Sequence, residues 1–251
     1  MSERVRLFAF LLFGGLFLAL YCYAIMDLPA WGFYRGPYGD VIAGVAVFER
    51  HATDVVNAIN YDYRAVDTLG EEFILFTAVL GVMMLLRRER GEKKKSRSVE
   101  SVPDRRVLST TIQAVSVPAV FLTVLFGLYI GLHGQLTPGG GFQAGVILAT
   151  APILVYLAQN TEAFRRITSH PVMEFIEALG AGSYAMIGLT ALGFGLPLLT
   201  NFLPLGETGD VFSSGTIALI SAMVGAEVTA AFLLVAYTYL EEIISGELSE
   251  E

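Results

Sequence analysis

The sequence predicts an all-α, polytopic membrane protein with about six transmembrane helices. Hydrophobic residues fill 54% of the 251 positions, charged residues only 16%, and the mean hydropathy is +0.61. Six apolar runs also approach the length of about 20 residues that a helix needs to cross the hydrocarbon core. These runs are 7–26, 70–86, 112–132, 142–158, 174–199 and 214–240.

The first run begins directly after Arg4 and Arg6 and has no small-residue cleavage site, so we expect a retained helix rather than a signal peptide. The segment 27–69 that follows is rich in glycine and proline at first and predicts irregular backbone there. Residues 52–63 then favour an amphipathic helix with Val55, Val56 and Ile59 on one face. Such a helix suits either a membrane interface or a partner contact.

A basic linker, 91–104, follows the second run and divides the chain. The predicted parts are a two-span hairpin over 1–90 and a four-span part over 105–245. The linker suits a solvated tether or a contact with anionic lipid head groups.

The positive charges predict the orientation. With both termini in the cytoplasm, 13 of the 16 lysine and arginine residues lie inside, and 3 lie outside: Arg35, Arg50 and Arg64. The positive-inside rule therefore favours cytoplasmic termini in a cell membrane.

The third and fourth runs are joined by a break segment, 133–142, which reads His-Gly-Gln-Leu-Thr-Pro-Gly-Gly-Gly-Phe. Lipid does not tolerate exposed irregular backbone, so the segment should be buried in protein or line a watery cavity. A tight interhelical turn is the plain alternative, although it needs fewer glycines. The residues expected to shape the break are Thr137, Pro138, Gly139, Gly140, Gly141 and Phe142, with His133 as a candidate proton relay.

Four carboxyl groups are candidates for an ion path. Glu227 lies near the middle of the sixth run, where an acidic side chain facing lipid would cost about 2.5–3.5 kcal/mol. Glu177, at the start of the fifth run, suits helix capping or proton uptake. Asp67 and Glu71, which stand beside Glu72 at the outer end of the second run, suit a cation-collecting mouth or a helix N-terminus. Glu227 is equally open to a packing role as a neutral, hydrogen-bonded acid.

Redox and metal chemistry find little support in the composition. One cysteine, Cys22, excludes an intrachain disulfide and a thiolate metal site, and three scattered histidines do not favour haem ligation. We expect no cofactor in this chain and no nucleic-acid partner.

Residues 133–145 read His-Gly-Gln-Leu-Thr-Pro-Gly-Gly-Gly-Phe-Gln-Ala-Gly and resemble the signature of the B subunit of Mrp-type multisubunit sodium/proton antiporters. That signature typically reads His-Gly-His-x-Thr-Pro-Gly-Gly-Gly-Phe-x-Gly-Gly. This chain departs from it at Gln135, where the family has a second histidine, and at Ala144, where it has a glycine.

Residues 55–71, Val-Val-Asn-Ala-Ile-Asn-Tyr-Asp-Tyr-Arg-Ala-Val-Asp-Thr-Leu-Gly-Glu, are similar to the terminal piece of the large A component of the same antiporters. The resemblance implies that Glu71 is the membrane acid of that piece. A free A-like terminus joined to a B-like part resembles the modules of archaeal membrane-bound hydrogenases and sulfur-reducing complexes, which oxidise ferredoxin.

The resemblance implies a subunit that is not catalytic alone. It would contribute to a sodium or proton path shared with other Mrp-like membrane subunits. The alternative class is a structural spacer that holds such modules together without conducting ions. A stand-alone channel or receptor fits less well, because the sequence predicts no soluble sensor domain.

Overall fold

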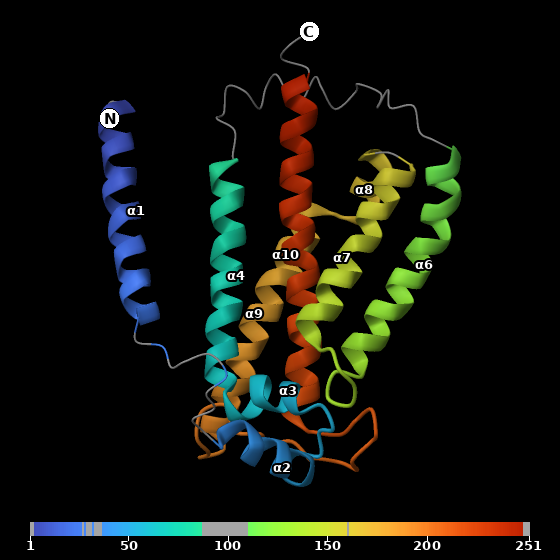
Figure 1. The fold of residues 1–251 in the computed structure, drawn as a ribbon. Coiled ribbons are helices and arrows are strands. Elements are labelled where there is room, and N and C mark those ends of the chain that lie inside the picture. The colour runs from blue at the N-terminus through green and yellow to red at the C-terminus, as the bar shows by residue number, and fades with distance from the viewer. Residues whose placement is uncertain are drawn as a thin grey trace. The chain divides into compact units, whose positions relative to one another are not determined.

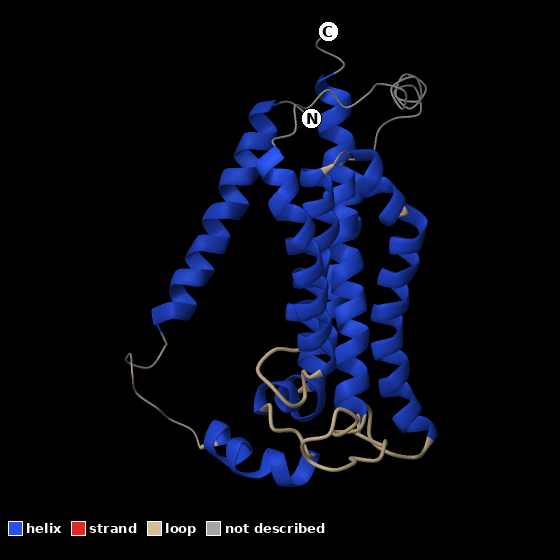
Figure 2. Ribbon diagram, turned by 90° about the vertical axis from the view of Figure 1, so that its right-hand side faces the viewer, coloured by secondary structure: helices blue, strands red, loops and turns tan. Residues whose placement is uncertain are grey.

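The structure is a computed structural model that describes residues 3–26, 28, 32, 37–86, 110–159 and 161–247. Within these ranges every regular element is a helix (Figure 2). Six of the helices are long and apolar enough to cross a membrane. The predicted fold class and number of spans are thus confirmed. The basic linker, 91–104, lies outside the described residues.

Helix α1 (Glu3–Met26) belongs to a compact unit of its own, Met1–Asp40. Its apolar side chains are exposed on every side, from Phe8 through Phe17 to Met26. A helix that is apolar all round is typical of a membrane span.

The second unit, Val41–Glu251, is built around helix α10 (Thr216–Glu247). This helix packs against α4, α7 and α9, and α6 packs on the far side of α7 (Figure 1). A short helix, α8, joins α7 to α9. The bounds are Ala65–Leu85 for α4, Thr110–Leu132 for α6, Gly141–Ala158 for α7, Thr161–Ile167 for α8 and His170–Gly193 for α9.

Small residues set how closely α7 and α10 approach. A Cβ atom added to Gly145 would stand 2.6 Å from the Cβ of Val228, and one added to Gly225 would stand 3.3 Å from the carbonyl oxygen of Gly141. In lipid, helices associate through close packing rather than the hydrophobic effect, and small residues at the contact allow it. Helix α10 thereby becomes the buried centre of the bundle.

At one end of this bundle, called the loop end, α2 (Tyr38–Arg50), α3 (Val55–Ala58) and the π-helix η1 (Ile59–Tyr63) lie beside the loops 133–140 and 194–215 (Figure 1). The opposite end, which carries α8, is called the α8 end. Helix α2 was not predicted, because the glycines and prolines that precede it indicated irregular backbone. Its Ile42 and Ala46, four residues apart, are buried.

The segment 52–63 packs against its own chain rather than standing apart. Val55 and Ile59 contact the core formed with α10, while Val56 is exposed. The predicted apolar face therefore exists in part, but the bundle supplies its partner.

Several predicted span limits differ from the structure by a few residues. Helix α4 begins at Ala65 rather than near 70, and α9 ends at Gly193 rather than at 199. After α9 the chain turns at Gly195, whose φ of 75° lies in the left-handed region, and Pro197 follows. These two residues stop the helix although the apolar composition continues.

Candidate functional site: a buried carboxyl cluster

Three glutamates from three helices meet inside the bundle. Glu72 on α4 is 4% exposed, Glu177 on α9 is 2% exposed and Glu227 on α10 is fully buried. Glu72 lies seven residues from the loop end of α4, and Glu177 lies seven residues from the α8 end of α9. At 1.5 Å per residue each is about 10 Å inside its helix end. We call these three side chains the carboxyl cluster.

The members of the cluster are close enough to act on one another. The Glu72 and Glu227 carboxyl groups are within hydrogen-bonding reach, and the Glu177 carboxyl interacts electrostatically with that of Glu227. Glycine makes room for this approach, since a Cβ atom on Gly180 of α9 would stand 2.5 Å from the Cβ of Glu227.

Few donors of the described residues serve the cluster. Both carboxyl oxygens of Glu227, Oε2 of Glu72 and Oε1 of Glu177 are buried without an N–H or O–H donor. Burying an ionised carboxylate without a partner is costly, so such oxygens call for a proton or a cation. A hydrogen bond between two carboxyl groups itself requires one proton. The cluster therefore has the chemistry of a site that takes up and releases protons.

Two tyrosines lie between the cluster and the loop end. The hydroxyl group of Tyr184 on α9 donates a hydrogen bond of 2.9 Å to the Ala65 carbonyl oxygen at the start of α4. The ring of Tyr61 on η1 meets the Tyr184 ring edge-on, with centroids 6.4 Å apart. Burial raises the pKa of Tyr61, so its phenol keeps its proton at neutral pH.

The break segment is held by a polar pair from α3, which we call the latch: Asp54 and Asn57. The Asn57 side-chain amide donates hydrogen bonds to the carbonyl oxygens of Gly134 and Gly139, the latter at 3.0 Å, and to Asp54 Oδ2 at 2.7 Å. Burial raises the pKa of Asp54, against the opposing effect of the Val56 N–H and Asn57 amide donors. The latch satisfies backbone oxygens that the broken helix leaves free.

The glycine run in the break segment has a conformational reason. Gly139 and Gly140 have φ angles of 150° and 132°, which side chains rarely allow. A Cβ atom on Gly140 would also stand 2.5 Å from Asn57 Oδ1. Helix α7 then starts at Gly141.

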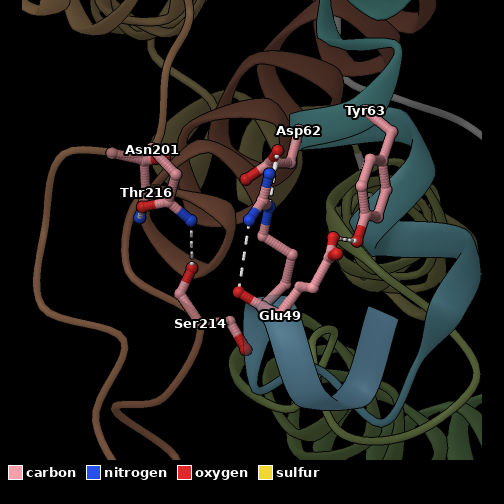
Figure 3. Close-up of polar contacts among 7 residues, drawn as sticks. Glu49, Asp62, Tyr63, Asn201, Ser214 and Thr216 are labelled. Atoms are coloured by element: carbon pink, nitrogen blue, oxygen red, sulfur yellow. Dashed lines mark hydrogen bonds and ion pairs between the residues drawn. The ribbon is translucent and has the colours of Figure 1, made fainter. Parts of the chain in front are cut away.

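Further polar contacts tie the loops of this end together (Figure 3). Arg50 of α2 forms an ion pair of 2.8 Å with Asp62 of η1, and the Tyr63 hydroxyl group donates to Glu49 at 2.8 Å. Asn201 accepts a hydrogen bond from the Thr216 N–H, which caps the start of α10. These polar contacts thus join the short helices and loops of the loop end to one another.

Comparison with known proteins agrees with this architecture. Residues 111–234 match a family described as a domain related to the MnhB subunit of Na⁺/H⁺ antiporters, and residues 2–105 match the family MbhE, described as the E component of MBH. An uncharacterized protein of Methanocaldococcus jannaschii is 30% identical over 210 residues, which cover 76% of this chain and 80% of that protein. The chain therefore carries an MbhE domain followed by an MnhB-related domain.

Two more similarities connect this MnhB-related chain with larger assemblies. A chain in the structure of the membrane-bound sulfane sulfur reductase, an archaeal respiratory membrane complex, is 29% identical with a TM-score of 0.69; the match covers 96% of this chain and 99% of that one. The probable K⁺/H⁺ antiporter A/B protein of Rhizobium meliloti is 30% identical over 70% of this chain. Our chain spans only 20% of that relative's length. The protein is a multi-pass membrane subunit of the Mrp type.

The structure of the MnhB-related subunit brings together two of the predicted ion-path residues, Glu227 and Glu177. The third carboxyl of the cluster is Glu72, whereas Glu71 is exposed on the surface of α4. Asp67 is exposed and forms an ion pair with Arg64 at the start of the same helix. These two acids therefore lie outside the cluster.

The other predicted residues belong to the break segment. His133 is half-buried and stacks on the ring of Tyr129, with centroids 4.4 Å apart, and its Nδ1 atom lies 3.0 Å from the Tyr129 carbonyl oxygen. Thr137 donates to the His133 carbonyl oxygen at 3.3 Å, Pro138 is exposed, and Phe142 meets Phe232 edge-on. Gln135, which replaces a family histidine, donates to the Val211 carbonyl oxygen at 2.6 Å.

The sequence favoured Glu71 over its neighbour Glu72 and gave no sign of the latch. Thr68 and Glu72 are both buried and four residues apart, so they lie on the same face of α4. Glu71 is one residue earlier and therefore points to a different side of the helix. A helical projection of α4 could have separated the two neighbouring acids. Asn57 gave no comparable signal, because its acceptors lie 77 and 82 residues away. Among the described residues no three His, Cys, Asp or Glu side chains are placed to hold a metal ion.

Proposed function

We propose that this chain supplies part of the cation path of an Mrp-like antiporter module within a ferredoxin-driven respiratory complex. The observation that carries the proposal is the carboxyl cluster, in which buried acids from α4, α9 and α10 meet without donors for most of their oxygens. Ionisable groups inside a membrane span are costly and are typical of ion and proton pathways.

In this path the ion moves stepwise between acids at different depths. Glu177 connects the cluster to the α8 end, Glu227 lies in the middle, and Glu72 lies toward the loop end. Glu71 faces outward from the same turn of α4. It would exchange the ion with a neighbouring membrane protein of the complex. His133 and Asp67 would act near the mouth at the loop end.

The proposed setting follows from the charge pattern and the relatives. Both termini would lie in the cytoplasm of a cell whose plasma membrane holds the complex, so the α8 end would face inward. Lipid would contact the exposed apolar faces of α6, such as Phe121 and Leu125. The transported species would be sodium ions or protons.

Substitution by an isosteric amide tests the path directly. In proteoliposomes that contain the whole complex, Glu227→Gln should reduce ion transport at least about tenfold, because a glutamine cannot take up and release a proton. The matched control is Glu207→Gln in the loop 194–215, where the carboxylate is exposed. The protein composition of the purified complex must stay unchanged in both variants.

The competing function is a structural spacer that packs modules together without conducting. It predicts that Glu227→Gln, Glu177→Gln and Glu72→Gln all transport normally, while removal of a whole span destroys assembly. Normal transport by all three variants would overturn the path proposed above.

A further inference from the structure

The start of α9 carries an ordered row of titratable side chains that leads into the carboxyl cluster. His170, Glu174 and Glu177 are spaced four and three residues apart, so they lie on one face of the helix. The row spans seven residues, which is about 10 Å along the helix axis. We propose that these residues form the proton-access route from the α8 end to the buried carboxyl cluster. The proposal rests on the function proposed above.

One contact and two electrostatic interactions link the members of the row. His170 Nδ1 lies 3.5 Å from Glu174 Oε1. The Glu174 carboxyl acts electrostatically on that of Glu177, which in turn acts on that of Glu227. The His170 ring also meets the Tyr237 ring of α10 edge-on, with centroids 5.2 Å apart, and this contact orients the imidazole.

Exposure falls steeply along the row, as an access route requires. The side chains of His170 and Glu174 are 31% and 50% exposed, whereas Glu177 is 2% exposed. Water therefore reaches the first two members, and only protein surrounds the third.

Helix capping explains part of the row but not all of it. The helix dipole and His170 together account for an acid at Glu174, which is close to the N-terminus. They do not account for Glu177, whose Oε1 atom is buried without a donor. That oxygen lies between a water-exposed acid and the fully buried Glu227, which is the position of a relay.

Both arginines of α8 form ion pairs outside the row. Arg165 of α8 pairs with Glu241 of α10 at 3.6 Å, and Arg166 pairs with Glu162 at 3.1 Å. Glu242 also lies on this last part of α10.

A proton would pass along the row by simple exchange. An imidazole near the water takes up a proton and gives it to the Glu174 carboxylate, which becomes a carboxylic acid. This acid protonates Glu177, and Glu177 protonates the Glu227–Glu72 pair. Each step moves one proton, and each donor returns to its starting form.

The pH profile of transport distinguishes this route from a structural role. In proteoliposomes with the whole complex, His170→Ala and Glu174→Gln should transport nearly as the wild type at about pH 6. At about pH 8.5, where protons are scarce, both should be slower by about tenfold. Added imidazole should restore the His170→Ala rate, because it replaces the missing side chain. The matched control is Glu162→Gln, which removes a carboxylate at the same end but outside the row.

Equal slowing at every pH, or no slowing at the alkaline pH, would overturn the route. The Glu227→Gln variant separates this failure from failure of the proposed function. If Glu227→Gln stops transport while the row variants keep the wild-type profile, the cluster conducts but protons reach it another way. If Glu227→Gln, Glu177→Gln and Glu72→Gln all transport normally, the route and the proposed function both fall.

Discussion

At the scale of single residues, Gly180 sets the surroundings of the most deeply buried acid. It lies on α9 directly against Glu227 of α10, and a side chain of any size there would meet the Glu227 Cβ and backbone. The short distance between the two helices is what lets Glu177 and Glu227 interact. This glycine therefore serves the cluster without touching an ion itself.

Gly180→Ala should consequently destabilise the protein. The added methyl group must push α9 and α10 apart, and overpacking of this kind costs about 1–3 kcal/mol. The midpoint of thermal unfolding of the detergent-purified complex should fall by several degrees, at about 2–4 °C per kcal/mol. Gly182→Ala is the control, since a Cβ atom there has no neighbour within 4 Å. Equal unfolding midpoints for the two variants would show that the helices do not meet as described.

Glu71 and Glu72 offer a second comparison at this scale. Glu72→Gln should reduce transport at every ionic condition, because it alters the buried cluster itself. Glu71→Gln should act more strongly when the partner proteins are present in full than in partly assembled complexes, since its side chain is exposed in this chain. Transport assays on both variants in the same membranes check the assignment.

Two of the three residues of the carboxyl cluster could be predicted from the sequence. Glu227 and Glu177 were predicted because acids inside apolar spans are conspicuous. Glu72 was not chosen, because two adjacent acids differ only in the helix face they occupy. That face depends on what packs against α4, and the packing is long-range.

Among the elements, the latch between α3 and the break segment has the clearest physical role. Asn57 donates to oxygens on both sides of the break, and Thr53 donates to the Leu136 carbonyl oxygen at 2.5 Å. The short helix α3 and the residues just before it thereby fix the loop between α6 and α7. Without these donors, buried carbonyl oxygens would be left unpaired.

Asn57→Ala should loosen the break segment. Each buried acceptor left without a donor costs about 1–3 kcal/mol, so amide protons in 134–141 should exchange about ten- to a hundredfold faster. Hydrogen exchange measured by mass spectrometry on the purified complex checks this. Asn60→Ala is the control, because the described contact of Asn60 is made by its backbone carbonyl oxygen, which accepts from Tyr184. If exchange in 134–141 is unchanged in Asn57→Ala, the latch does not hold the break.

Most elements were predictable because a membrane span is a long apolar run, and all six were found this way. Helix α2 was missed because its buried face, Ile42 and Ala46, is short and follows a glycine-rich stretch. The break segment was predicted from proline and glycine, and the structure buries Gly134, Gln135, Gly140 and Gly141 of it while Pro138 is exposed. Its covering partner, α3, could not be predicted, because the contact joins residues 77 positions apart.

In the unit Val41–Glu251, the elements before the basic linker and those after it form a continuous core. Helix α4 packs against α9 and α10, and η1 packs against α10. Two buried clusters of apolar side chains also combine residues of both parts, one around Tyr61 and Tyr184 and one around Val79 and Leu234. We therefore expect this contact to form even when the basic linker is cut.

A chain cut in the linker should accordingly reassemble. Fragments 1–95 and 96–251, produced in the same cells, should purify together and complete the complex, because the contacts of α4 with α9 and α10 remain. Affinity purification through a tag on one fragment checks this. Fragment 96–251 produced alone is the control. It should be unstable, because it lacks α4, which packs against α10 beside Glu227. Fragments that separate on purification would contradict the shared core.

The latch has a further consequence when the two parts belong to one chain. A contact between separate chains forms in proportion to their concentrations, whereas a tether holds its partners at an effective concentration in the millimolar range. Covalent linkage thus keeps α3 and the break segment in a one-to-one ratio at any level of expression. Because α3 and the break segment are synthesised in one chain, the carbonyl oxygens of Gly134 and Gly139 always have the Asn57 donor available in the same molecule.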